Sequence, residues 1–301
     1  MPHQNLAQYI HANVSAALEE DLCQIPPLPH VGERESKCRD AALLEYDLTA
    51  QLLPSAQNVT ATIISREQMV LCGTRWFEAC FHRLDPGCIV RWTANEGELV
   101  QADQPLCELH GNTRALLCAE RSALNFLQTL SGTATLVRRY VEAVSGTHAK
   151  IMDTRKTLPG LRIAQKYAVL IGGGHNQRIG LYDGVLIKEN HIAASGGIRA
   201  VLEQALFITP PGISIQIEVE NLKQLDEALD AGAGLILLDN FSLADMRRAV
   251  AHAAKCAELE ASGGITLANV REVAETGVHR ISVGALTKDV AAIDLSMRIV
   301  T

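Results

Sequence analysis

The stretch GLILLDNFSLADMRRAVAHAAK, residues 234–255, contains one complete strand-and-helix pattern. Four consecutive aliphatic residues at 235–238 end in Asp239 and Asn240. After Ser242, a residue type that commonly caps helices, apolar residues recur at intervals of three and four. A short buried strand followed by an amphipathic helix is the repeating unit of α/β proteins, so this stretch predicts a parallel sheet.

The same unit recurs at nearly equal spacing from about residue 150 onward. Its strand runs are AKIMDTRK (149–156), DGVLIKEN (183–190), IQIEVEN (215–221), GLILLDN (234–240), AELEASGG (257–264) and HRISVGALT (279–287). Equal spacing favours a barrel over an open sheet, and a complete barrel of this type has eight strands. We therefore predict an α/β fold whose residues 136–288 form an incomplete barrel of about six parallel strands.

The first half of the chain has a different pattern. Residues 58–73 and 88–111 alternate apolar and polar positions and break at Gly, Pro and Asn-Glu-Gly, as antiparallel strands do. Residues 1–22 resemble an amphipathic helix, and residues 115–144 predict two helices that lead into the barrel. We predict an N-terminal α/β sandwich domain over 1–135, with a C-terminal helix at 289–301 packing back on it.

Composition limits the possible classes of function. The chain has 301 residues and a formal net charge of -7, and it contains no apolar run of about 18 residues. These features predict a soluble, cytoplasmic protein and disfavour a general nucleic-acid or membrane binder. Its eight cysteines are scattered without a CxxC pair, which predicts buried free thiols, and the proline- and charge-rich residues 24–40 predict an exposed loop.

Polar residues end each predicted strand, where a parallel barrel forms its ligand site. A lone lysine or arginine is more often a salt-bridge partner than a ligand, but cations at several strand ends favour a site for an anionic ligand. Glycines at the last two strand ends would allow backbone amides to approach a phosphate. The strand-end residues are Asp153 to Lys156, Lys188 to Asn190, Glu218, Glu220, Asp239, Asn240, Ser262 to Gly264, Gly284 and Ala285.

Five segments together resemble one enzyme family. They are ERSALNFLQTLSGTAT (120–135), DTRKTLPGLR (153–162), KYAVLIGGGHNQRIGLYDGVLIKENH (166–191), ILLDNF (236–241) and GVHRISVGALT (277–287). In order and content they are similar to the quinolinate phosphoribosyltransferases, also called nicotinate-nucleotide pyrophosphorylases (carboxylating). The resemblance implies a type II phosphoribosyltransferase fold, assembled as a homodimer with active sites shared across the interface.

The resemblance also implies a reaction: quinolinate and 5-phosphoribosyl-1-pyrophosphate give nicotinate mononucleotide, pyrophosphate and carbon dioxide, with magnesium, in de novo NAD biosynthesis. Lys156, Lys188, Glu218 and Asp239 take the catalytic positions, and the two carboxylates among them serve the ribose and a Mg²⁺ ion bound to pyrophosphate. The implied substrate-binding set adds Arg121, Thr154, Arg155, Arg162, Gln177, Arg178, Ser262, Gly263, Gly264, Val283, Gly284 and Ala285.

One position departs from the family pattern. The family usually has Asn-His-Arg after the glycine loop, whereas this chain has Asn176, Gln177 and Arg178, with a histidine at 175. A glutamine can donate a neutral hydrogen bond to a carboxylate but cannot become cationic. The sequence therefore gives no support to acid–base chemistry at position 177.

Three other functions stay open from the residues alone. A phosphoribosyltransferase of the same fold could act on another heteroaromatic acid. A Schiff-base aldolase-type barrel could use Lys188, which ends a strand. The hairpin-like segment GELVQADQPLCEL (97–109) is similar to carrier domains, although it lacks the lysine that would carry a cofactor.

Overall fold

The computed structural model describes residues 5–22, 44, 47–254 and 256–300. The chain divides into two compact units, which are described separately. The first comprises Met1–Thr135, Ile163–Ile171 and Val290–Thr301, and the second comprises Leu136–Arg162 and Gly172–Asp289. The loop predicted at 24–40 lies outside the described residues. None of the described helices is both long and apolar enough to cross a bilayer.

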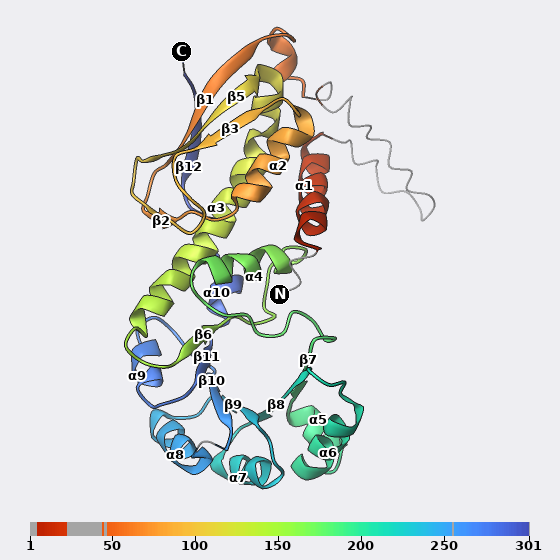
Figure 1. Ribbon diagram of the computed structural model, residues 1–301, viewed down its shortest axis with the longest axis vertical. Coiled ribbons are helices and arrows are strands. Elements are labelled where there is room, and N and C mark those ends of the chain that lie inside the picture. The colour runs from red at the N-terminus through yellow and green to blue at the C-terminus, as the bar shows by residue number, and fades with distance from the viewer. Residues whose placement is uncertain (1–4, 23–43, 45–46, 255, 301) are drawn as a thin grey trace. The chain divides into compact units, whose positions relative to one another are not determined.

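The first unit is built on a four-stranded antiparallel sheet with the order β12-β1-β5-β3, and Figure 1 shows α2 and α3 lying alongside it. The alternation predicted for residues 58–73 and 88–111 is confirmed, since it produces all the strands of this unit except β12. The elements are α1 (Leu6–Leu22), a 3-10 turn (Ala50–Leu52), β1 (Asn58–Ser65), β2 (Met69–Val70), α2 (Thr74–Leu84), β3 (Ile89–Trp92), β4 (Leu99–Val100), β5 (Pro105–Asn112), most of α3 (Thr113–Ala143), α4 (Arg162–Ile171) and β12 (Leu295–Val300).

Two helices of this unit show how the sequence pattern determines packing. In α1 the buried residues are Leu6, Ile10, Val14, Leu18 and Leu22, spaced by four as in an amphipathic helix. The region 115–144, predicted as two helices, is instead part of the single helix α3. Gly132 lies within this helix without interrupting it. A Cβ at this position would lie 2.1 Å from the Ala291 carbonyl oxygen, so only glycine fits there. The glycine lets the C-terminal segment approach the helix closely.

The C-terminal segment differs from its prediction. It joins the first unit, but residues 295–300 form the edge strand β12, paired antiparallel with β1, and no helix spans 289–301 in the described chain. Alternating residues such as Leu295, Met297 and Ile299 suit a strand when a sheet edge is available to pair with them. Helix α4, within the predicted barrel domain, also groups mainly with the first unit.

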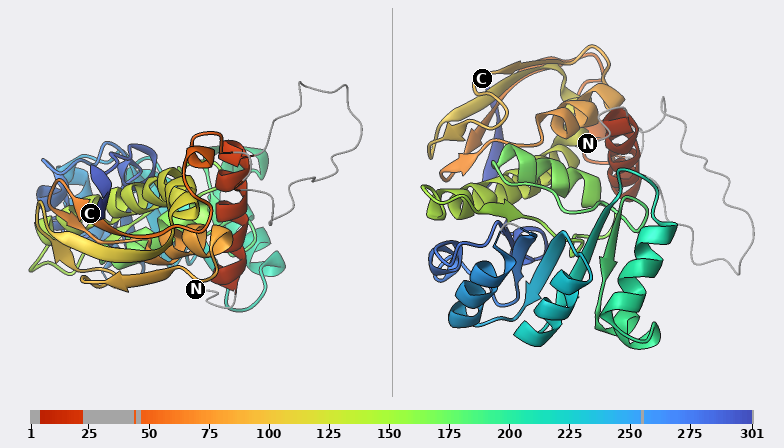
Figure 2. Two further views of the ribbon diagram at one scale, coloured as in Figure 1. Left: turned by 90° about the horizontal axis from the view of Figure 1, so that it is seen from above. Right: turned by 60° about the horizontal axis from the view of Figure 1, so that its bottom comes forward.

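The second unit confirms the predicted incomplete barrel. Its sheet contains six parallel strands in the order β6-β11-β10-β9-β8-β7, and Figures 1 and 2 show helices along their outer side. The strands are β6 (Lys150–Met152), β7 (Gly184–Ile187), β8 (Ser214–Val219), β9 (Leu235–Asp239), β10 (Glu258–Ser262) and β11 (Arg280–Ser282). The helices are α5 (Glu189–Ala194), α6 (Ile198–Ile208), α7 (Leu222–Asp230), α8 (Leu243–Ala253), α9 (Val270–Ala274) and α10 (Ala285–Lys288).

Strands β6 and β7 are the two ends of this sheet and are not paired with each other. The segment after the glycine loop lies along β6 instead. His175 forms a parallel bridge with Met152: its amide donates to the Ile151 carbonyl at 2.8 Å, and its carbonyl accepts from the Asp153 amide at 3.0 Å. His175 therefore adds one parallel bridge at the β6 edge, where a further strand would stand in a complete barrel.

The cysteines largely follow their prediction. Cys72, Cys80, Cys88, Cys107 and Cys118 are buried free thiols, and burial raises their pKa values. Cys256 is exposed, which corrects the prediction at that position, because it lies outside β10 in the connection from α8. Cys23 and Cys38 lie outside the described residues.

Candidate active site at the strand ends

The residues that follow the barrel strands come together at the carboxyl end of the sheet. Lys156, after β6, lies against Gly284, after β11: a Cβ on Gly284 would be 3.3 Å from Lys156 Cδ. Thr287 Oγ donates to the Lys156 carbonyl at 2.7 Å, and the Lys156 amide donates to Thr154 Oγ at 3.0 Å. These contacts fix the lysine-bearing loop against the last strand end.

Lys188, Glu218 and Asp239 form a mixed-charge group on neighbouring strand ends. Lys188 Nζ lies 3.6 Å from a Glu218 carboxylate oxygen, and the Glu218 side chain is only 14% exposed. Burial raises the pKa of Glu218; Lys188 opposes that rise, while Asp239 and Glu189 add to it. Asp239 accepts a hydrogen bond from the Asn240 side chain at 2.9 Å. The negative charges of Glu218 and Asp239 repel each other, so a further positive charge bound beside them would be stabilising.

The carboxylates of Glu218 and Asp239 also suit a divalent cation whose remaining ligands come from substrate or water. The described residues contain no group of three or more His, Cys, Asp or Glu side chains that could hold a metal ion. Magnesium is commonly held by one or two protein carboxylates together with substrate phosphates and water. Glu218 and Asp239 could therefore bind a metal that arrives with a phosphate ligand, but they do not form a complete protein site.

Arg155 and Arg178 bring two positive charges close together at the mouth of the barrel. The Arg155 Nε atom is shielded from solvent and has no hydrogen-bond partner among the described residues. Arg178 donates to the Gly184 carbonyl at 2.9 Å, and its pKa is lowered by burial and by the nearby Arg155 charge, with Asp183 opposing. Two arginines that repel each other and include a buried, unsatisfied donor are suited to an anionic ligand.

The two glycine-containing strand ends differ in what they offer a phosphate. Gly263 and Gly264 have positive φ angles of 97° and 61°, and a Cβ on Gly263 would lie 2.1 Å from Asn240 Oδ1. This conformation and close approach require glycine. The Val283 amide donates to the Met152 carbonyl at 3.0 Å and is therefore already engaged in the sheet. Gly284 and Ala285 remain the candidate amides at that strand end, with Ser262 to Gly264 at the other.

Gln177 lies against a residue that the sequence argument does not identify. Its Nε2 atom is 2.5 Å from both carboxylate oxygens of Glu260, a fully buried residue of β10. Gln216 Nε2 donates to the same carboxylate at 3.0 Å, and Ser282 Oγ also donates to it. Glu260 lies two residues before Ser262 on the same strand, so the two side chains point to the same face of the sheet. An acidic residue at that spacing from a strand-end site residue is the sequence feature that could have identified it.

Two further predicted residues occupy different places. Arg162, at the start of α4, donates to Thr157 Oγ at 3.2 Å and to the Ile179 carbonyl at 3.2 Å, joining the loops after β6 and before β7. Arg121 is exposed on α3 within the first unit. The structure thus gathers the barrel residues at the strand ends, while Arg121 belongs to another unit of the chain.

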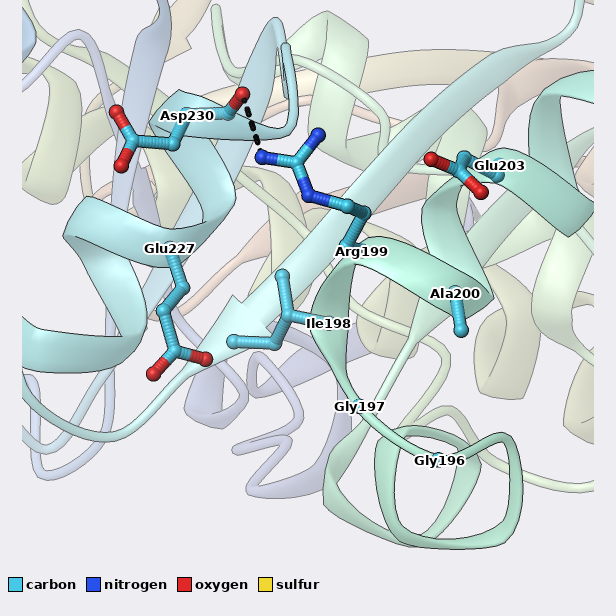
Figure 3. A pocket seen from close by; sticks show the side chains of 8 residues that line it. All are labelled: Gly196, Gly197, Ile198, Arg199, Ala200, Glu203, Glu227 and Asp230. Atoms are coloured by element: carbon cyan, nitrogen blue, oxygen red, sulfur yellow. Dashed lines mark hydrogen bonds between the residues drawn. The ribbon is translucent and has the colours of Figure 1, made fainter.

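A surface pocket of about 480 Å³ lies apart from these residues. It is lined by residues 196–200 with Glu203, Glu227 and Asp230, and Figure 3 shows Arg199 directed at the Asp230 carbonyl, to which it donates at 3.2 Å. None of the predicted site residues lines it. Its arginine is already hydrogen-bonded and its other charged side chains are acidic, so the strand ends remain the better site for an anion.

Comparison with known proteins agrees with this geometry. Family models described as the N-terminal and C-terminal domains of quinolinate phosphoribosyl transferase match residues 47–131 and 133–298. A probable nicotinate-nucleotide pyrophosphorylase (carboxylating) of Bacillus subtilis is 40% identical, covering 83% of this chain and 87% of the relative. The nicotinate-nucleotide pyrophosphorylase (carboxylating) of Mycobacterium leprae is 42% identical, covering 83% and 90%.

Solved structures show the same similarity over the whole fold. The nicotinate-nucleotide pyrophosphorylase of Francisella tularensis superposes with a TM-score of 0.87 at 40% identity, covering 97% of this chain and 96% of that one. The enzyme of the same name from Ehrlichia chaffeensis gives a TM-score of 0.84 at 35% identity, covering 98% of each chain. Because both domain models match and the identities extend over most of each relative, the chain belongs to the quinolinate phosphoribosyltransferase family.

Proposed function

We propose that this protein is a quinolinate phosphoribosyltransferase that converts quinolinate and 5-phosphoribosyl-1-pyrophosphate into nicotinate mononucleotide, pyrophosphate and carbon dioxide. The observation that carries the proposal is the charge at the barrel mouth. Burial and the nearby Arg155 charge both lower the pKa of Arg178, and Arg155 Nε is buried without a partner among the described residues. An acid with two carboxylates supplies what both guanidinium groups need.

The sugar substrate fits the remaining strand ends. Lys156 and Lys188 suit phosphate groups, which need less directional donors than carboxylates do. The amides of residues 262–264, with those of Gly284 and Ala285, suit the 5-phosphate. Thr154, whose hydroxyl accepts from the Lys156 amide, holds the lysine loop in shape, and Arg162 braces that loop against the segment before β7.

No side chain needs to form a covalent bond to the substrate. The pyridine nitrogen attacks the anomeric carbon as the bond to pyrophosphate breaks, through a transition state with oxocarbenium character. The protein contributes orientation and positive charge beside the leaving group. The ring nitrogen, once quaternised, stabilises the carbanion that forms as carbon dioxide leaves, and that carbanion is then protonated. In this proposal Glu218 and Asp239 bind the ribose hydroxyls.

Magnesium, when bound with the pyrophosphate, would neutralise charge that develops on the leaving group. Glu218 and Asp239 are the residues that would hold it. The Schiff-base alternative has less support, because Lys188 Nζ lies 3.6 Å from the Glu218 carboxylate and so already has an acidic partner instead of the apolar pocket that such a lysine needs.

The proposed function predicts that quinolinate is used and nicotinate is not. Nicotinate has one carboxylate, so it leaves cationic donors near Arg155 unpaired, at a cost of several kcal/mol. Purified protein should release carbon dioxide and form nicotinate mononucleotide from quinolinate, the phosphoribosyl donor and magnesium. Chelation of magnesium should stop the reaction. Equal turnover of nicotinate would instead indicate a relative acting on another heteroaromatic acid.

Replacing either strand-end lysine should remove most of the activity. For Lys156→Ala and Lys188→Ala we expect kcat/KM to fall about 100-fold or more, because each removes a cation beside developing negative charge. Circular dichroism should be unchanged. Lys223→Ala is the matched control, because Lys223 is 87% exposed on α7 and its ion pair is with Glu227 of its own helix. Near-native turnover in a strand-end variant would exclude that lysine from the mechanism.

The raised pKa of Glu218 predicts the acidic limb of the pH–rate profile. Activity that needs the ionised carboxylate falls as pH drops through this pKa, so the limb should lie above the ordinary glutamate range. The Glu189 charge contributes to the rise, so Glu189→Gln should lower the pKa and shift the acidic limb of kcat/KM to lower pH. Glu203→Gln, an exposed change on α6, is the control. An unmoved limb in Glu189→Gln would mean that another group controls it.

We also propose a homodimer in which Arg121 of one protomer completes the barrel site of its partner, as the family resemblance implies. Mixing inactive Arg121→Ala and Lys156→Ala proteins under subunit exchange makes about half the dimers mixed. Each mixed dimer then has one intact site, so about a quarter of the native activity should return. If Arg121 serves its own barrel, every site keeps one defect and no activity returns.

A further inference from the structure

We propose that Glu260 is a positioning residue that acts through Gln177 to place Arg178 for binding of the pyridine acid. The inference rests on the proposed function and adds a residue to that site. Several hydrogen bonds converge on the Glu260 carboxylate, which is buried in the barrel interior and does not lie at the mouth.

The Glu260 carboxylate is fully buried and is surrounded by uncharged donors. It accepts from Gln177 Nε2 at 2.5 Å, from Gln216 Nε2 at 3.0 Å and from Ser282 Oγ. A buried carboxylate is costly unless its oxygens are satisfied, so these donors are held firmly in place. Removing one of them, or the acceptor, disturbs all the others.

Gln177 is consequently fixed at two points. Its side chain donates to Glu260, and its backbone amide donates to Asp153 Oδ1 at 2.8 Å. Asp153 is itself fully buried and also accepts from Asn176 Nδ2 at 2.7 Å. The Gln177 side chain is thus held by Glu260 on β10, and its backbone is held by Asp153, the residue that follows β6.

The next residue in the chain is Arg178, whose pKa is lowered by burial and, to a smaller extent, by the nearby Arg155 charge. Because Gln177 is covalently joined to Arg178, the bonds that fix Gln177 also restrict where the Arg178 backbone can lie, in addition to the direct bond from the Arg178 side chain to the Gly184 carbonyl. The side chain of residue 177 points to Glu260, so its amide hydrogens serve the barrel interior. Its effect on the substrate therefore passes through the position of Arg178.

The direct test is Glu260→Gln in the full-length protein. The variant keeps the shape of the side chain but replaces one acceptor oxygen with an amide group that donates. The side chains of Gln177, Gln216 and Ser282 then have one acceptor atom fewer between them. We expect KM for quinolinate to rise about tenfold, with kcat and KM for the phosphoribosyl donor changed less than about twofold. Glu258→Gln, two residues earlier on β10 and paired with Arg280, is the matched control and should leave both KM values unchanged.

A double-mutant cycle separates positioning from general structural damage. In an Arg178→Lys background, adding Glu260→Gln should raise the quinolinate KM no further, because the group that Glu260 positions is already gone. Equal increases in both KM values, or full additivity in the cycle, would overturn the proposal. An unchanged quinolinate KM in a folded Glu260→Gln protein would overturn it as well.

Gln177→Asn keeps the test decisive if Glu260→Gln does not fold. The shorter amide cannot reach Glu260, while the backbone bond to Asp153 remains, so the same selective rise in quinolinate KM is expected. Thermal unfolding checks that the variant is folded, and an unchanged quinolinate KM would reject the role of Gln177. Failure of the proposed function is distinguishable, because the unsubstituted protein would then not turn over quinolinate at all.

Discussion

The active end of the barrel depends on one constraint: six parallel strands leave β6 and β7 as unpaired ends of a single sheet. The chain joins these ends with residues 175–178. Main-chain bonds attach His175 to β6, buried Asp153 binds Asn176 and the Gln177 amide, and Arg178 donates to the carbonyl of Gly184, the first residue of β7. A short polar segment thus connects the two end strands, and Arg178 at its end lies at the mouth of the barrel.

Electrostatics explains why this segment must be held so firmly. The chain carries a formal net charge of -7, yet its barrel mouth brings cations from several strand ends close together. Such cations repel one another in the absence of an anion, and burial of Arg178 and of Arg155 Nε reduces the screening that water would supply. Hydrogen bonds from the Thr287 hydroxyl to the Lys156 carbonyl and from the Arg162 side chain to the Ile179 carbonyl hold the loops against that repulsion. An anionic substrate then reduces the repulsion between these cations. Because the fold already holds the cations in place, the site favours ligands with several negative groups.

The layer beneath the mouth is polar where complete barrels have branched apolar side chains. Glu260, Gln216 and Ser282 point inward from β10, β8 and β11, and Gln177 joins them from the segment beside β6. Hydrogen bonds are directional, so this layer specifies where each participant lies more narrowly than apolar packing does. Glu218 and Ser262 follow Gln216 and Glu260 by two residues on their strands, so the polar layer and the mouth are directly stacked.

The sequence by itself determined the six βα units, the antiparallel character of the first half and the strand-end residues, because each depends on local periodicity and on the rule that parallel strands end on one side. It identified Lys188, Glu218 and Asp239 as candidates for the same reason. It could not show that residues 295–300 pair with β1, that Gly132 lies inside one continuous helix against Ala291, or that Val283 uses its amide within the sheet. Those outcomes depend on neighbours far away in the chain. Only the tertiary structure decided the partner of Gln177, since Glu260 lies 83 residues away and their hydrogen bond exists because β10 and the segment beside β6 face the same barrel interior.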